Sequence, residues 1–107
     1  MSKIDPSTLI CEEAIEYSIE LWTWLAETGL NKRAWPGWYR FHTVPYSYCF
    51  LCEFNNTHIK PGDALCARCP VGNCSETPYV KWYDSKNVPD RQTYAKEFLE
   101  ILKSLEV

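Results

Sequence analysis

Residues 49–74 read CFLCEFNNTHIKPGDALCARCPVGNC and hold five of the six cysteines of the chain. Two Cys-x2-Cys pairs, Cys49/Cys52 and Cys66/Cys69, are separated by thirteen residues. Each pair can place two sulfurs on one edge of a tetrahedron, and two pairs complete the coordination that structural zinc prefers. We therefore predict a Zn²⁺ ion held by Cys49, Cys52, Cys66 and Cys69, with Cys74 as the reserve ligand.

Other uses of these cysteines stay open at this stage. Cys74 or an imidazole, from His42 or His58, can replace one of the four ligands. An iron–sulfur cluster is less favoured, because the bacterial ferredoxin pattern has a denser run of cysteines. A thiol redox centre is less favoured again, because its Cys-x2-Cys normally opens a helix within a βαβ unit. Cys11 lies on a predicted helix face and is expected to act as a small hydrophobic residue.

The composition predicts one globular, cytoplasmic domain spanning residues 1–107. The 107 residues include five Trp, seven Tyr and four Phe, which supply the apolar burial that a small domain needs. The first residues lack a charged segment followed by an apolar run, so no signal peptide is predicted, and no stretch is long enough to span a membrane. Cysteines in a reducing compartment favour metal binding over disulfides.

Two amphipathic helices are predicted, over residues 6–28 and 89–105. Asp5 and Pro6 favour a helix start and Gly29 favours a stop, while Asn87 or Asp90 can cap the second helix. Apolar residues recur at helical spacing in both segments. They are Cys11, Ala14, Ile15, Ser18, Trp22 and Leu25 in the first, and Ala95, Phe98, Leu102 and Leu105 in the second. The predicted fold is a small α-rich domain in which these helices pack together beside an irregular aromatic and zinc-binding segment, residues 35–83, with little β structure.

The first predicted helix also carries an acidic row. Glu12, Glu16 and Glu20 are spaced four residues apart and share one helix face. One interpretation is an ordinary solvated face. The other is a surface for a basic partner.

Residues 32–41, KRAWPGWYRF, interleave bases with aromatic rings. The Pro36-Gly37 pair predicts a turn, and residues 39–42 can form a short strand or part of a hairpin. Bases alternating with rings are typical of platforms that stack single-stranded nucleic acid. The same rings can instead fill the core beside the zinc, and the net charge of −3 does not favour nucleic-acid binding by the whole domain.

A family resemblance rests on YCFLC at 48–52, CARCPV at 66–71, Cys74, TPY at 77–79 and Trp82. These motifs resemble small cysteine-rich, zinc-binding proteins of tailed phages and prophages, most of them uncharacterised. The resemblance implies a viral origin and metal binding, and a cytoplasmic location in the host cell. It brings no catalytic site with it.

The predicted function is therefore non-enzymatic. A four-cysteine zinc site is closed, whereas a catalytic zinc keeps an open position. With the phage resemblance, the sequence favours a protein that binds a host protein, such as a defence factor, and inhibits or redirects it by steric occlusion. The predicted partner-binding residues are Glu12, Glu16, Glu20, Trp35, Trp38 and Arg40, with further aromatic anchors in 35–41 or 79–83. The alternatives are a zinc-ribbon-like nucleic-acid module using residues 32–41, and an iron–sulfur or thiol redox protein.

Overall fold

The computed structural model describes residues 3–45, 48–63, 69–72 and 77–105, and these are mostly helical. Four α-helices are present in this part of the chain: α1 (Cys11–Thr28), α2 (Phe50–His58), α3 (Tyr79–Asp84) and α4 (Val88–Ser104). Three short 3-10 helices accompany them: η1 (Pro6–Thr8), η2 (Lys32–Ala34) and η3 (Pro36–Arg40). The α-rich fold is thus confirmed. None of the helices described is long and apolar enough to cross a membrane.

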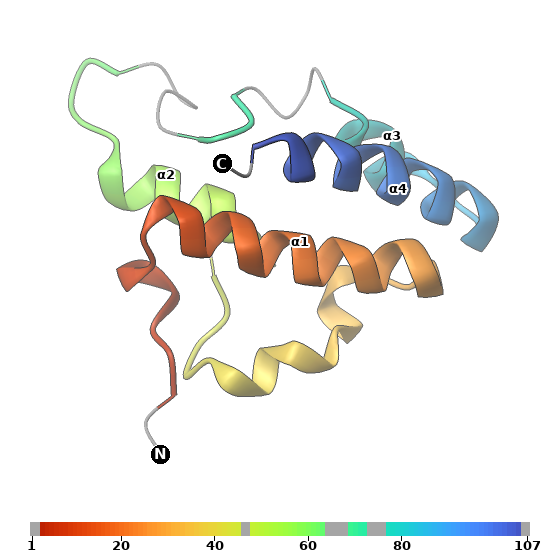
Figure 1. Ribbon diagram of the computed structural model, residues 1–107, viewed down its shortest axis with the longest axis horizontal. Helices are drawn as coiled ribbons and strands as arrows, with labels where there is room; N and C mark the ends of the chain where they lie inside the picture. The colour runs from red at the N-terminus through yellow and green to blue at the C-terminus, as the bar shows by residue number, and fades with distance from the viewer. Residues whose placement is uncertain (1–2, 46–47, 64–68, 73–76, 106–107) are drawn as a thin grey trace.

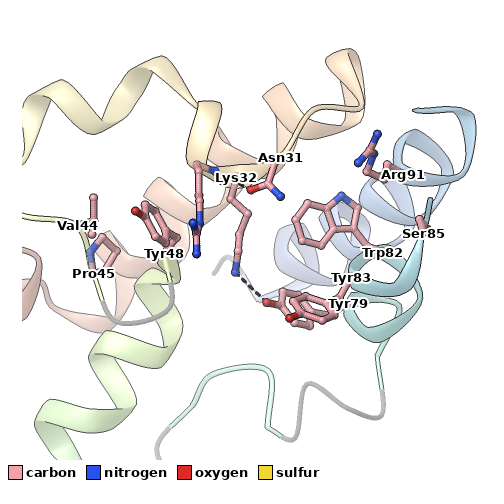
Figure 2. A pocket seen from close by; sticks show the side chains of 11 residues that line it. Asn31, Lys32, Val44, Pro45, Tyr48, Tyr79, Trp82, Tyr83, Ser85 and Arg91 are labelled. Atoms are coloured by element: carbon pink, nitrogen blue, oxygen red, sulfur yellow. Dashed lines mark hydrogen bonds between the residues drawn. The ribbon is translucent and has the colours of Figure 1, made fainter. Parts of the chain in front are cut away.

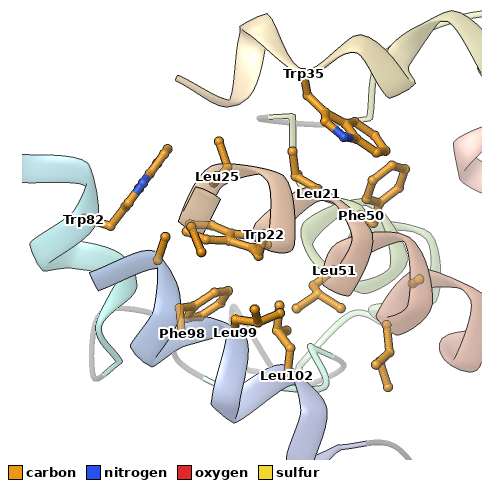
Figure 3. Packing of buried hydrophobic residues seen from close by; sticks show 14 of the residues in the cluster. Leu21, Trp22, Leu25, Trp35, Phe50, Leu51, Trp82, Phe98, Leu99 and Leu102 are labelled. Atoms are coloured by element: carbon orange, nitrogen blue, oxygen red, sulfur yellow. The ribbon is translucent and has the colours of Figure 1, made fainter. Parts of the chain in front are cut away.

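The predicted pairing of the first and last helices is confirmed, since α1 and α4 run side by side (Figure 1). Their apolar stripes face each other, and Trp22 of α1 lies 4.6 Å from Phe98 of α4 between ring centroids. Figure 3 shows these rings with Leu25, Leu99 and Leu102 in the same core. The expected positions on both stripes are buried, except that Cys11 and Leu105 are half-buried at the ends.

The start of the first helix differs from the prediction. Asp5 caps η1 instead, where its Oδ1 accepts the Ser7 N–H at 2.9 Å. Pro6 fits the first position of that short turn, and the chain is then extended at Leu9. The α-helix begins only at Cys11, where the Ile10 N–H donates to Glu13 Oε1 at 3.0 Å. The predicted start at residue 6 is therefore wrong by five residues.

The ends of the helix pair follow the sequence signals. Gly29 closes α1 in the left-handed conformation, with φ of 68°, and its N–H donates to Leu25 O at 2.9 Å. Asn87 caps α4, because its side-chain oxygen accepts the Asp90 N–H at 2.9 Å. The two ends are tied together, since Gln92 Nε2 donates to Glu27 O at 2.9 Å.

The central chain, from Asn31 to Asp84, is more helical than predicted. Residues 39–42 do not form a strand: Pro36–Arg40 is a 3-10 helix, and only Phe41 makes an isolated parallel bridge, with Ile4. No hairpin occurs among the residues described. Gly37 is required by packing, because a Cβ there would meet the Trp35 ring at 2.3 Å. That ring stands 6.1 Å from Phe50 of α2 between centroids (Figure 3).

Candidate functional site

The first cysteine pair opens a helix and does not sit in an irregular knuckle. Cys49 is the N-cap of α2, and its Sγ accepts the Cys52 N–H at 3.3 Å. Cys52 lies in the first turn of the same helix. The prediction of an irregular segment is therefore wrong here, because residues 50–58 contain enough apolar side chains to pack α2 on α1.

Three of the predicted ligands share one cavity. Cys49, Cys52 and Cys69 line a space of about 190 Å³ beneath α1, together with apolar side chains such as Leu51 and Val71. Cys66 and Cys74 lie outside the described residues. Within the described part of the chain, no three Cys, His, Asp or Glu side chains come close enough to hold a metal ion. A centre with the predicted ligands would thus need Cys66 or Cys74 and also a closer approach of Cys49, Cys52 and Cys69.

The electrostatics of this cavity suit a thiolate. A side-chain hydrogen bond from Cys52 lowers the pKa of the Cys49 thiol to about 6, against the opposing effect of burial. Backbone hydrogen bonds and the positive charge of Lys32 act in the same direction as Cys52. Zinc binds the thiolate form of cysteine, so the donor chemistry fits the metal.

The alternative ligands lie elsewhere. His42 is exposed, with Nε2 3.5 Å from Asp5 Oδ2. His58 stacks on Phe54 at the end of α2, with ring centroids 4.1 Å apart. Cys11 begins α1 and packs against the core. None of these three side chains lines the cavity that holds the described cysteines.

The predicted partner-binding residues divide into two groups. Glu12, Glu16 and Glu20 are exposed along α1, and Glu20 Oε1 accepts from Arg40 Nη2 at 2.8 Å. Trp35 is only 5% exposed and Trp38 is half-buried, so these two rings belong mainly to the core.

Among the described residues of the central chain, the largely exposed rings are two tyrosines. Tyr39 is 72% exposed and Tyr83 is 71% exposed. Phe41 and Trp82, from the two segments predicted to supply anchors, are buried. Each of the segments 35–41 and 79–83 therefore has one largely exposed ring.

A second, larger cavity was not predicted from the sequence. It has a volume of about 720 Å³ and lies between η2, α3 and the start of α4 (Figure 2). We call it the cation–aromatic pocket. Its lining residues are Asn31, Lys32, Arg33, Val44, Pro45, Tyr48, Tyr79, Trp82, Tyr83, Ser85 and Arg91. Lys32, Arg33 and several of the rings stood out in the sequence, but Arg91 did not, because it reaches the pocket from a distant helix.

Lys32 connects the two cavities. Its side chain lines both, and the residue is only 8% exposed. Its Nζ donates to the Tyr79 hydroxyl at 2.8 Å and stands 5.0 Å from the centroid of the same ring (Figure 2). The positive charge of Lys32 therefore lies between the cation–aromatic pocket and the cavity lined by Cys49, Cys52 and Cys69, which we call the thiol cavity.

In comparisons with known proteins, no family model, no curated protein and no solved structure matches this chain. The resemblance to phage proteins therefore stays an expectation from the motifs quoted above.

Proposed function

We propose that this chain is a non-catalytic, zinc-stabilised binding protein that engages a basic surface of a partner protein through the outer face of α1. The phage-like motifs suggest a host protein as the partner, with inhibition or redirection by steric occlusion. Zinc would be held by Cys49, Cys52 and Cys69 with Cys66 or Cys74. Its role is structural, since a metal that fixes these segments contributes directly to folding.

The observation that carries the proposal is the contrast between the two faces of α1. One face is buried against α2 and α4, whereas Glu12 and Glu16 are exposed on the other. Like charges four residues apart repel by a few tenths of a kcal/mol, so the spacing of the row does not itself stabilise the helix. Charge of one sign on an exposed face favours association with an oppositely charged surface and speeds the encounter.

The 3-10 helix η3 supplies a fixed edge to this face. Arg40 bonds to Glu20, and its guanidinium carbon lies 5.3 Å from the ring centroids of both Tyr17 and Trp35. The preceding residue of η3, Tyr39, leaves most of its surface exposed. Tyrosine is one of the residue types that most often anchor protein interfaces.

Charge reversal with a matched control tests the proposal. The double variant Glu12→Lys/Glu16→Lys changes the α1 face, and Glu97→Lys/Glu100→Lys makes the same change on an exposed part of α4. Affinity capture from host lysate, quantified by mass spectrometry, is compared for wild type and both variants. We expect wild type and the α4 variant to capture a basic protein that the α1 variant does not capture. Binding measured with that protein in purified form should likewise be weakened only by the α1 variant. Equal capture by all three baits would contradict the proposal.

The thiol redox alternative gains one specific observation. Cys49 caps a helix and its pKa is lowered to about 6, which is the setting of a reactive cysteine. Against it, no βαβ unit occurs among the described residues. Alkylation of the purified protein at neutral pH separates the two: a zinc-held Cys49 would resist alkylation until a chelator is added, whereas a redox thiol would react at once.

The nucleic-acid alternative loses its continuous platform. Trp35 and Phe41 are buried, so residues 32–41 do not present a row of free rings. Lys32 and Arg33 remain at the cation–aromatic pocket, where rings from other segments join them.

A further inference from the structure

The cation–aromatic pocket has a charge pattern that selects anions. Lys32, Arg33 and Arg91 line it, and no Asp or Glu lines it among the residues that the structure describes. The chain as a whole has a net charge of −3, so this concentration of positive side chains is local. A pocket lined by charge of one sign attracts small ligands of the opposite sign even when the whole protein does not.

Two buried donors in this pocket lack a hydrogen-bond partner in the part of the chain that the structure describes. They are the indole Nε1 of Trp82 and Nε of Arg91. Trp82 is 4% exposed and lies between Asn31 and Arg91 in Figure 2. Buried donors are normally satisfied by protein, water or a ligand, and an unmet one reduces stability. Both donors belong to residues that line the pocket.

Aromatic rings supply the other half of the site. Tyr79 and Tyr83 of α3 are stacked, with centroids 6.3 Å apart and an interplanar angle of 26°. The exposed ring of Tyr83 leaves a flat surface at the edge of the pocket. On the opposite side the Arg33 guanidinium carbon lies 5.3 Å from the Tyr48 ring centroid. Exposed rings beside cations are suited to stacking a nucleobase.

We propose that the cation–aromatic pocket binds a nucleotide. The phosphate would lie against Arg33, Arg91 and the Trp82 indole N–H, and the base would stack on Tyr83. The volume of about 720 Å³ falls in the range of roughly 300–1,000 Å³ typical of small-ligand sites. Because the pocket joins three cations to one largely exposed ring, the ligand is a free mononucleotide or one nucleotide of a single strand. This site is independent of the acidic face of α1.

Binding is tested by isothermal calorimetry and tryptophan fluorescence on the full chain purified with its metal. The probes are the common ribonucleoside monophosphates, short single-stranded oligonucleotides, nucleosides without phosphate, inorganic phosphate and a phosphotyrosine peptide. Nucleotides should bind and should perturb the tryptophan fluorescence, whereas nucleosides and phosphate alone should bind at least about tenfold more weakly. The oligonucleotide arm distinguishes the sources: a strand that binds while monophosphates do not identifies single-stranded nucleic acid.

Paired variants locate the site. Arg33→Gln should weaken nucleotide binding by about tenfold or more, whereas Lys96→Gln, an exposed cation on α4, should not. Tyr83→Ala should weaken it, and Tyr39→Ala, an equally exposed tyrosine elsewhere, should not. All four positions are exposed, so the fold should persist, and circular dichroism checks this. The proposal is overturned if no nucleotide or oligonucleotide binds, if the phosphotyrosine peptide binds and nucleotides do not, or if Arg33→Gln binds as well as wild type.

Discussion

The α1–α4 pair and the central chain, from Asn31 to Asp84, are stabilised in different ways. In the helix pair, residues repeated at helical spacing on one helix meet a similar stripe on the other. In the central chain, short helices are joined by rings from distant positions, such as Trp35 and Phe50. Both regions are held by contacts between distant residues, but those of the pair follow a helical spacing, whereas those of the central chain follow no periodic spacing and, in our proposal, are joined by a metal.

Removing a predicted zinc ligand should have the largest effect, and that effect should differ most between the central chain and the helix pair. Cys52→Ser should abolish stoichiometric zinc binding and remove hydrogen-exchange protection from α2, because metal binding energy is also folding energy. Amides in the middle of α1 and α4 should keep more of their protection. Hydrogen exchange read by mass spectrometry gives both values in one experiment.

Cys11→Ser is the control for that variant, since Cys11 lies outside the thiol cavity. It should retain both the zinc and the protection of α2. Unchanged metal content in Cys52→Ser would remove this residue from the predicted ligand set.

A cavity in the helix pair should have the next largest effect. Leu102 is fully buried between α4 and α1, so Leu102→Ala should lower the free energy of unfolding by about 2–5 kcal/mol. Guanidinium unfolding measures this loss. The neighbouring exposed Lys103→Ala should change it little. A loss below about 1 kcal/mol for Leu102→Ala would mean that the pair contributes less than its packing indicates.

A substitution at Gly29, which ends α1, should cause the smallest of these losses of stability. Gly29→Ala requires a left-handed alanine, at about 1–2 kcal/mol, and its Cβ would also stand 2.5 Å from Val88 Cγ1. Gly62→Ala is the matched control, because Gly62 also has positive φ but has no atom within 4 Å of such a Cβ. Thermal unfolding should show the larger loss for Gly29→Ala. Equal losses would show that contact with α4 adds nothing at this position.

The sequence predicted the helix pair well because its signals are local. Gly29 and Asn87 mark their helix ends by conformation and capping, and the apolar spacing identifies the buried faces. The start of α1 was misplaced because Asp5 and Pro6 are equally good at opening a 3-10 turn. Distinguishing the two starts requires the Glu13 contact with the Ile10 N–H, and a side chain at this spacing is only a weak signal.

The central chain was harder to predict for a physical reason. The Cys49–Cys52 spacing indicates metal binding, but it does not show that the intervening residues start a helix. The cation–aromatic pocket brings Lys32, Tyr48, Trp82 and Arg91 together from four separate segments. No periodic spacing in the sequence indicates that these residues lie together. The residue types could therefore be noted from the sequence, but the pocket could not be predicted.

The most direct test of the central claim is elemental mass spectrometry of protein purified under reducing conditions, read together with its visible absorbance. A structural zinc site predicts about one zinc ion per chain and a colourless protein. A brown protein that carries iron and sulfide would contradict the claim and would make the iron–sulfur alternative the leading one. Protein with no bound metal, despite intact thiols, would leave the central chain to be held by its aromatic contacts alone and would equally contradict it.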